Sequence, residues 1–260
     1  MKNNDTLDQQ DLPKLILIGR NAILEALNHE KPMDKILLKR GGVDGTLRVI
    51  AAKARERGVV LQEVDKAKLD ELSESGNHQG VVGLCPAKGY VEIDEILAYA
   101  ESKKEAPFVL VLDGIMDPHN LGAILRSAES AGVHGVILPK RRSVGLTPVV
   151  AKTSSGAIEH ILISRVTNLS DALTKLKNSG LWIACADMEG GDLFHADLSG
   201  PIALLIGSEG TGVSRLLVKN SDFTVKIPMY GHIGSLNASV AAGILMYEVV
   251  RRRKYMGAAP

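Results

Sequence analysis

The chain has 260 residues and a mass of 27.8 kDa, a length that favours one large or two modest domains. Its hydrophobic share of 45% and charged share of 23% allow a sizeable core and exclude a chain that is disordered throughout. Because 31 Lys and Arg balance 30 Asp and Glu to a net charge of +1, any nucleic-acid partner must use local basic patches.

The two cysteines, Cys85 and Cys185, stand far apart and outside any Cys/His cluster. This usage predicts neither a zinc site nor a disulfide framework and fits a reducing compartment. The N-terminus is polar, and the longest apolar runs, such as 108–112, are far shorter than the roughly 20 residues that span a bilayer. We therefore expect a cytoplasmic protein with no signal peptide, membrane segment or bound metal.

The first third of the chain predicts a polar tail and a small α/β unit. Residues 1–13 carry few apolar side chains, which is typical of a flexible tail. Over residues 14–88, helical and strand patterns alternate. Helices are expected at 21–27, 46–57 and 66–72, and strands at 35–39, 59–64 and 80–85. Residues 89–106 combine a short amphipathic stretch with a polar run before Pro107, a composition that predicts a linker.

Continuous apolar runs mark the remainder of the chain. Strands are expected at 108–112, 135–138, 181–185, 202–206 and 223–227, and helices at 121–131, 168–178, 212–219 and 236–253. Runs that do not alternate with polar residues suit strands covered on both faces, as in a parallel sheet between helices. Residues 107–260 are therefore predicted to form a second, larger α/β domain.

In open α/β sheets, ligands bind at the loops that follow the carboxyl ends of the strands. The first such loop leads into a helix that carries Asn120 and Arg126. In isolation, Asn120 fits a helix N-cap and Arg126 a surface charge. The second loop, 207–212, reads GSEGTG, and its glycines permit close approach to a ligand. Glu209 and the lack of a Walker lysine argue against a triphosphate.

The third loop runs from a short strand into the C-terminal helix through the string SLNAS, residues 235–239. Ser235 is predicted to be the N-cap of this helix, because serine is among the residues preferred there. Asn237 and Ser239 are either functional groups or merely part of the first helical turn. The helix that follows is small and apolar on much of its circumference, so it must be buried, and a second copy of the chain is one possible partner.

Together, the strings NLGAILR at 120–126, GSEGTG at 207–212 and SLNAS resemble the motifs of the SpoU, or TrmH-like, family of RNA ribose 2'-O-methyltransferases in the SPOUT class. IGRNAILEAL at 18–27 and NHQGVVG at 77–83 are similar to the L30e-like domain that precedes the catalytic domain in the 23S rRNA guanosine-2'-O-methyltransferase branch. The resemblance covers essentially the whole chain, with no departure at the motif positions. It implies an L30e-like substrate-binding domain at 14–88 and a SPOUT methyltransferase domain at 107–260.

The resemblance also implies S-adenosylmethionine as methyl donor, held by a deep trefoil knot in the C-terminal part of the chain. By the motifs, its contacts fall on Gly207, Ile227 and Leu236, with Leu205, Ile206, Met229 and Ser235 as neighbouring candidates. Backbone groups and aliphatic side chains on sharply turning loops can enclose an adenine and a methionine moiety without a phosphate-binding lysine. Without the motifs, Ile227 and Leu236 would be taken for ordinary core residues.

Methyl transfer to a ribose 2'-hydroxyl requires the hydroxyl to be oriented and its proton removed. Arg126 matches the family's arginine, and two roles stay open for it: general base, or orientation of the hydroxyl and the adjacent phosphate. A guanidinium with a pKa above about 12 is a poor base, which favours orientation. The remaining motif positions, whose side chains can hydrogen-bond the ribose or one another, are Asn120, Glu209, Asn237 and Ser239. The family implies a homodimer with the pocket beside the interface.

Two local basic clusters offer contacts to RNA phosphates. Residues 31–57 hold eight bases against three acids, and Lys140, Arg141 and Arg142 follow a strand of the second domain. Aromatic residues make up only 3% of the chain, so shape, phosphates and an exposed nucleotide are better cues than base stacking. The domain order favours 23S ribosomal RNA as substrate. A transfer RNA methyltransferase and a noncatalytic RNA-binding or ribosome-assembly protein are the alternatives.

Overall fold

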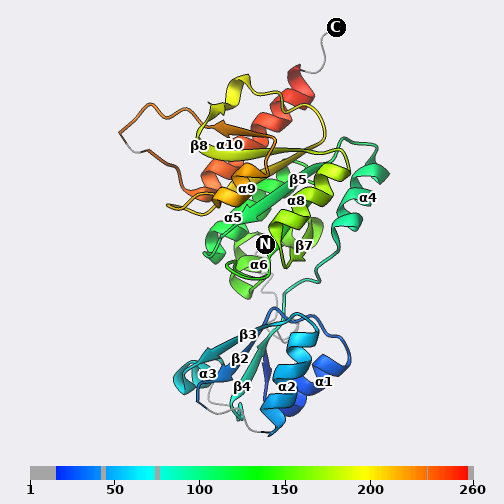
Figure 1. Ribbon diagram of the computed structural model, residues 1–260, viewed down its shortest axis with the longest axis vertical. Coiled ribbons are helices and arrows are strands. Elements are labelled where there is room, and N and C mark those ends of the chain that lie inside the picture. Colours follow the sequence, from blue (N-terminus) through cyan, green and yellow to red (C-terminus); the bar gives the residue numbers. More distant parts are fainter. Residues whose placement is uncertain (1–15, 42–44, 74–76, 233, 257–260) are drawn as a thin grey trace, which may run out of the picture. The chain divides into compact units, whose positions relative to one another are not determined.

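The structure is a computed structural model that describes residues 16–41, 45–73, 77–232 and 234–256. They form two compact units (Figure 1). The first extends to Ala87 and includes Leu146–Pro148, and the second comprises Lys88–Gly145 and the chain from Val149 onward. The tail predicted at 1–13 lies outside the described residues.

The first unit is a four-stranded mixed sheet with helices on both faces. Its elements are β1 (Ile16–Ile18), α1 (Arg20–Asn28), β2 (Lys35–Lys39), α2 (Gly45–Glu56), β3 (Val60–Val64), α3 (Lys66–Leu72) and β4 (Val81–Leu84). The strand order is β1-β4-β2-β3, with β2 and β3 parallel and the other pairs antiparallel. Strand β1 was not predicted, because three residues are too few for a period-two pattern to be recognised.

Alternation along the strands of this sheet builds two cores. Ile36 and Leu38 face α1 and α2, where they pack with Ile23 and Ile50. On the opposite face, Leu37 and Val82 pack with Leu69 of α3. Since neighbouring strand residues point to opposite sides, the run KILLK supplies apolar side chains to both cores.

The fold of the first unit brings together the two segments that carry its family resemblance. Arg20 begins α1, and its backbone N–H donates to Gln79 Oε1 at 3.2 Å. The Arg20 guanidinium Nε donates in turn to the carbonyl oxygen of Gln79 at 3.0 Å. Gly19 and Gly80 adopt φ values of 90° and 82°, which a side chain would disfavour. The conformation of each segment therefore depends on the other.

The second unit has one six-stranded sheet in the order β10-β8-β9-β5-β6-β7, with every strand pair parallel. Its strands are β5 (Phe108–Asp113), β6 (Gly135–Pro139), β7 (Leu162–Val166), β8 (Trp182–Asp192), β9 (Ile202–Gly207) and β10 (Phe223–Lys226). Its helices are α4 (Ile93–Lys103), α5 (Pro118–Ser130), α6 (Pro148–Thr153), α7 (Ala157–His160), α8 (Leu169–Asn178), α9 (Arg215–Lys219) and α10 (Ala238–Arg251), with the short 3-10 helix η1 (Leu193–His195) and the short π-helix η2 (Arg252–Met256). The predicted parallel α/β architecture is confirmed.

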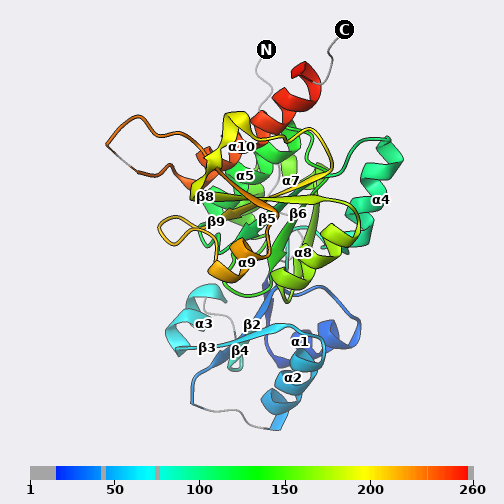
Figure 2. The same cartoon turned by 45° about the horizontal axis from the view of Figure 1, so that its top comes forward.

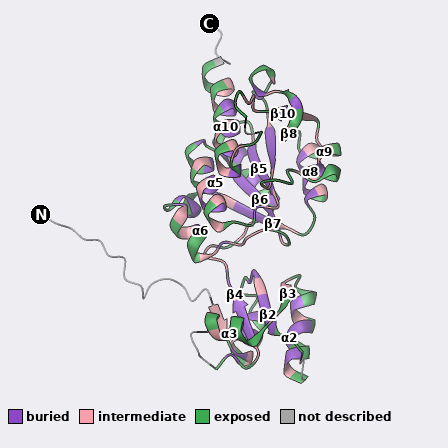
Figure 3. Ribbon diagram, turned by 90° about the vertical axis from the view of Figure 1, so that its left-hand side faces the viewer, coloured by how far each residue is buried: buried purple, intermediate pink, exposed green. Residues whose placement is uncertain are grey.

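Helices cover both faces of this sheet (Figure 2). Side chains of α4, α8 and α9 pack on one face against Val109, Val111 and Leu205. Helices α5 and α10 lie on the other face and bury residues such as Ile124 and Met246 completely. Figure 3 shows the central strands β5 and β6 as buried along most of their length, and β9 between β8 and β5 is buried likewise, which explains their unbroken apolar runs.

The segment 89–106, predicted to be a linker, is instead mostly helix and packs on the core of the second unit. Ile96 of α4 is fully buried, and a Cβ added to Gly135 on β6 would lie 2.6 Å from its side chain. The polar run at 101–105 led to the linker prediction. It forms the exposed last turn of α4 and the residues after it. Among the strands and α-helices of this unit, β7, α6 and α7 were not predicted either.

Candidate functional site

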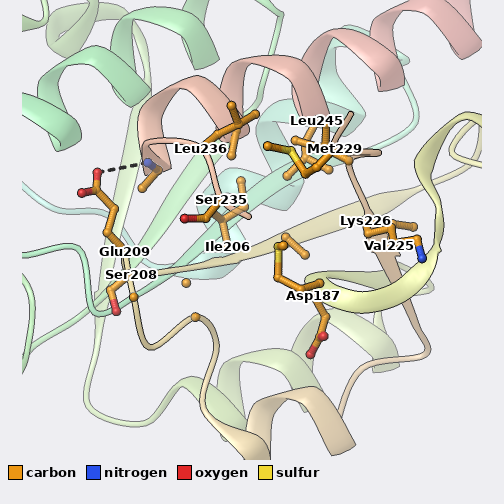
Figure 4. A pocket seen from close by; sticks show the side chains of 18 residues that line it. Asp187, Ile206, Ser208, Glu209, Val225, Lys226, Met229, Ser235, Leu236 and Leu245 are labelled. Atoms are coloured by element: carbon orange, nitrogen blue, oxygen red, sulfur yellow. Dashed lines mark hydrogen bonds between the residues drawn. The ribbon is translucent and has the colours of Figure 1, made fainter. Parts of the chain in front are cut away.

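A cavity of about 210 Å³ opens at the carboxyl ends of β8, β9 and β10, beside the first turns of α10 (Figure 4). Its walls include the apolar side chains of Ile206, Leu236 and Leu245. Two carboxylates, Asp187 and Glu209, also line it. Such a cavity suits a ligand with an apolar planar part and a positive charge.

The GSEGTG loop turns back on its own strand beside this cavity. A Cβ at Gly207 would lie 2.1 Å from the carbonyl carbon of Gly212, so only glycine fits where the loop crosses the strand end. Gly210 and Gly212 take φ values of 82° and 64°, which also favour glycine. The Ser208 and Thr211 hydroxyls hydrogen-bond at 2.6 Å. The absence of a side chain at Gly207 thus allows the backbone of Gly212 to pack against the end of β9.

Six of the seven predicted cofactor-binding residues line the cavity: Ile206, Gly207, Ile227, Met229, Ser235 and Leu236. Leu205 does not, because alternate residues of a strand point to opposite faces. Its side chain is fully buried beneath the other helical layer. Sequence reasoning missed Asp187 and Leu245, which the continuation of β8 past residue 185 and the first turns of α10 bring to the cavity.

A hydrogen-bonded network joins three of the predicted catalytic residues at the edge of the cavity. Glu209 Oε1 accepts from Asn120 Nδ2 at 2.8 Å, from Asn237 Nδ2 at 2.6 Å and from the Ala238 N–H at 3.1 Å, the last drawn as a dashed line in Figure 4. Asn237 Nδ2 also lies 2.9 Å from Asn120 Oδ1. Within the described part of the chain, Glu209 Oε2 has no hydrogen-bond partner, so one oxygen of a firmly held carboxylate is available to a ligand.

Two predicted caps are corrected. Helix α10 begins one residue after Asn237, whose Oδ1 accepts from the N–H groups of Ser239 and Val240; Ser235 lies too far before the helix to cap it. Asp117, not Asn120, caps α5. Asn237 therefore serves the first helical turn with its oxygen and the network with its nitrogen, so its two interpretations are compatible. The Ser239 hydroxyl donates to the same Asn237 oxygen at 2.6 Å.

Arg126 lies apart from this network. Its side chain is exposed and donates from Nη1 to Ser155 Oγ at 3.3 Å. It lies six positions after Asn120 on α5, which places it about 9 Å further along the helix axis. A single chain does not bring the guanidinium to Glu209.

Cys185 does not contribute a nucleophile to this region. Burial raises the pKa of its thiol to about 12, which keeps it protonated at neutral pH. In the described part of the chain, no three His, Cys, Asp or Glu side chains are grouped to hold a metal ion. None of the described helices is long and apolar enough to cross a membrane.

Comparison with known proteins identifies the family. Residues 107–247 match the SpoU rRNA Methylase family, and residues 16–91 match the domain described as "RNA 2'-O ribose methyltransferase substrate binding". A Bacillus subtilis (strain 168) relative, "Putative TrmH family tRNA/rRNA methyltransferase YacO", is 46% identical over 93% of this chain and 97% of its own.

Among the solved structures that share the fold are two with bound AdoMet. AviRb, a SpoU methyltransferase of Streptomyces viridochromogenes in complex with AdoMet, has a TM-score of 0.56 and 26% identity over 91% of this chain and 89% of its own. An AdoMet-bound rRNA methyltransferase of Sinorhizobium meliloti has a TM-score of 0.58 and 26% identity over 92% and 87% of the two chains. Matched along both units, this chain belongs to the SpoU rRNA methylase family.

Proposed function

We propose that this protein transfers the methyl group of S-adenosylmethionine to a ribose 2'-hydroxyl, that of a guanosine in 23S ribosomal RNA. The observation that carries the proposal is the cavity at the ends of β8–β10, with the Asn120–Glu209–Asn237 network at its edge. The AdoMet complexes of two structural neighbours support the cofactor.

The lining of the cavity fits S-adenosylmethionine. Ile206, Leu236 and Leu245 offer an apolar surface to the adenine. The carboxylate of Asp187 complements the positive charge of the cofactor. When bound, the cofactor supplies an activated methyl group. That a trefoil knot holds it is part of this proposal.

In this proposal the network orients the acceptor. Glu209 Oε2 accepts a hydrogen bond from the 2'-hydroxyl, while Asn120 and Asn237 hold the carboxylate through Oε1. Ser239 restrains the Asn237 amide. Arg126 is exposed and separate from Glu209 of its own chain. We therefore propose that Arg126 of a second copy of the chain acts at this site, where its guanidinium orients the phosphate beside the target ribose. The active form is then a cytoplasmic homodimer.

The first unit would read the RNA. Its match to a substrate-binding domain and the basic surplus at 31–57 support this role, and the domain order favours ribosomal RNA. Transfer RNA is the second candidate substrate, because the name of the B. subtilis relative includes both RNA classes.

Methyl transfer to RNA from cells that lack this protein tests the proposal directly. Purified protein and labelled S-adenosylmethionine should mark 23S ribosomal RNA at one ribose, and mapping identifies the nucleotide. Label in transfer RNA alone would shift the assignment to the second candidate. Label on a base, or none in any RNA, would refute ribose methylation.

Glu209→Gln tests the network in the same assay. We expect at least a hundredfold slower single-turnover transfer, because one carboxylate oxygen is replaced by a donor in a site that demands an acceptor. Calorimetry should show that the variant still binds S-adenosylmethionine. Arg126→Ala should also slow transfer at saturating RNA, and Arg126→Lys should not rescue it because the planar fork is lost.

A further inference from the structure

A basic loop follows β6 at the same edge of the sheet as the candidate site. Between residues 139 and 158 the chain holds four bases, Lys140, Arg141, Arg142 and Lys152, and no acid. Arg141 and Arg142 are exposed. Neither has an ion-pair or hydrogen-bond partner among the residues that the structure describes. Within the described part of the chain, nothing therefore neutralises their charges.

The backbone of this loop is held in place although its two arginines are not. The Lys140 N–H donates to the Val166 carbonyl at 2.7 Å, and the Arg165 guanidinium donates to the Lys140 carbonyl at 3.2 Å. Arg142 adopts a left-handed φ of 56°, a conformation that residues other than glycine rarely adopt. The loop thus presents its arginines from a fixed and locally strained backbone.

The topology places this loop beside the catalytic network. Strand β5 pairs with β9, which leads to Glu209, and on its other side with β6, which leads to the basic loop. Two strand spacings separate the two loops, about 10 Å. The Val144 N–H donates to the Ile115 carbonyl at 3.0 Å, which ties the basic loop to the segment that leads into Asn120.

We infer that Arg141 and Arg142 form a phosphate-binding site for the RNA strand next to the target nucleotide. The inference rests on the proposed function, since it takes the Asn120–Glu209–Asn237 network as the position of the acceptor ribose. RNA is the polyanion that a family of RNA methylases must hold at this edge. One guanidinium group can bind two oxygens of a phosphate at once. Two phosphates held by these arginines would position the ribose between the phosphates and the cofactor. This site belongs to the second unit and acts independently of the first.

Filter binding of in vitro transcribed Bacillus subtilis 23S ribosomal RNA over a range of salt concentrations tests the site. In Arg141→Gln/Arg142→Gln, RNA affinity should fall about tenfold. The slope of log K against log salt should become shallower by about one for each arginine lost. Arg141→Lys/Arg142→Lys keeps both charges and should keep the salt slope. The matched control is Lys219→Gln/Lys254→Gln, at exposed lysines without partners among the described residues, and should change little.

Two further readouts separate this inference from the proposed function. Calorimetric affinity for S-adenosylmethionine should be unchanged in the glutamine variant, because neither arginine lines the cavity. A wild-type salt slope in that variant would overturn the phosphate site, even if the wild-type protein methylates RNA. Conversely, a shallower slope would support the site even if the wild-type protein transfers no methyl group, an outcome that contradicts only the proposed function.

Discussion

Two basic runs of this chain, 140–142 and 251–254, look alike in sequence but differ in what their arginines contact. In the C-terminal run, Arg251 and Arg252 donate to the carboxylate of Glu248, whose side chain is 3% exposed. Arg253 donates to the carbonyls of Ala106, Pro107 and Gly200. The arginines of the first run have no such partners among the residues described in the structure. A charge run is therefore structural or available to a ligand according to what its fold places around it.

The largest effect should come from removing the charge of Glu248, the carboxylate that two arginines of the C-terminal run contact. Glu248→Gln replaces an oxygen with an amide donor that faces two guanidinium groups. We expect a loss of about 2–3 kcal/mol in unfolding free energy, and no more, because the Arg251 side chain is 43% exposed. Urea unfolding monitored by Trp182, the only tryptophan and a residue of the second unit, measures it. Glu101→Gln, at an exposed position, is the control and should cost less than about 0.5 kcal/mol.

Arg253→Gln should cost about 2 kcal/mol in the same measurement. The variant removes the donor to the carbonyls of Ala106 and Gly200 and one of the two donors to that of Pro107. It also removes the guanidinium that lies 5.2 Å from the centre of the Phe108 ring. Arg141→Gln is the matched change in the other run and should leave stability within about 0.5 kcal/mol. Equal losses in both variants would remove the contrast between the two runs.

A pH titration should reveal a smaller effect at His134, close to the C-terminal run. Burial lowers the pKa of His134 below 6.5, and the charge of Arg253 adds to this, although Glu105 opposes it. The Phe108 N–H donates to Nδ1, so the neutral ring is protonated at Nε2 and faces Glu105 at 3.1 Å. Because the unfolded chain takes up the proton first, stability should fall as the pH drops from about 6.5 toward the folded pKa, by at most about 1.4 kcal/mol per pH unit. His134→Asn should lose this component of the slope.

The smallest effect on stability, and one of opposite sign, is expected from Arg142→Gly. Glycine relieves the left-handed backbone, so the unfolding free energy should stay level or rise by up to about 1 kcal/mol while RNA affinity falls. Arg141→Gly is the control: its φ is not positive, so glycine there should destabilise by about 0.5–1 kcal/mol. A destabilised Arg142→Gly would show that this side chain supports the fold, as those of the C-terminal run do.

Much of the fold could be predicted from local pattern. The apolar runs at 108–112 and 202–206 mark strands covered on both faces, and their position in the sheet follows from that burial. Helix α4 was not predicted, because the polar composition of its end is typical of a linker. Its packing on the core is decided by the contact between Ile96 and Gly135, which lie far apart in the chain. Local composition indicates exposure along a segment, but it does not show which apolar side chains find a partner far away in the chain.

The sequence by itself determined the family motifs and, through them, six residues that line the cavity. Only the tertiary structure decided how they work together. It joins Glu209 to Asn120 and Asn237 across 89 and 28 residues, turns Leu205 away from the cavity, and separates Arg126 from the network. It also pairs the arginines at 251–253 within the fold and leaves Arg141 and Arg142 without partners in the described part of the chain. The physical reason is that a polar side chain has the same chemistry wherever it lies, whereas its role depends on the donors, acceptors and charges that distant segments bring within hydrogen-bond range.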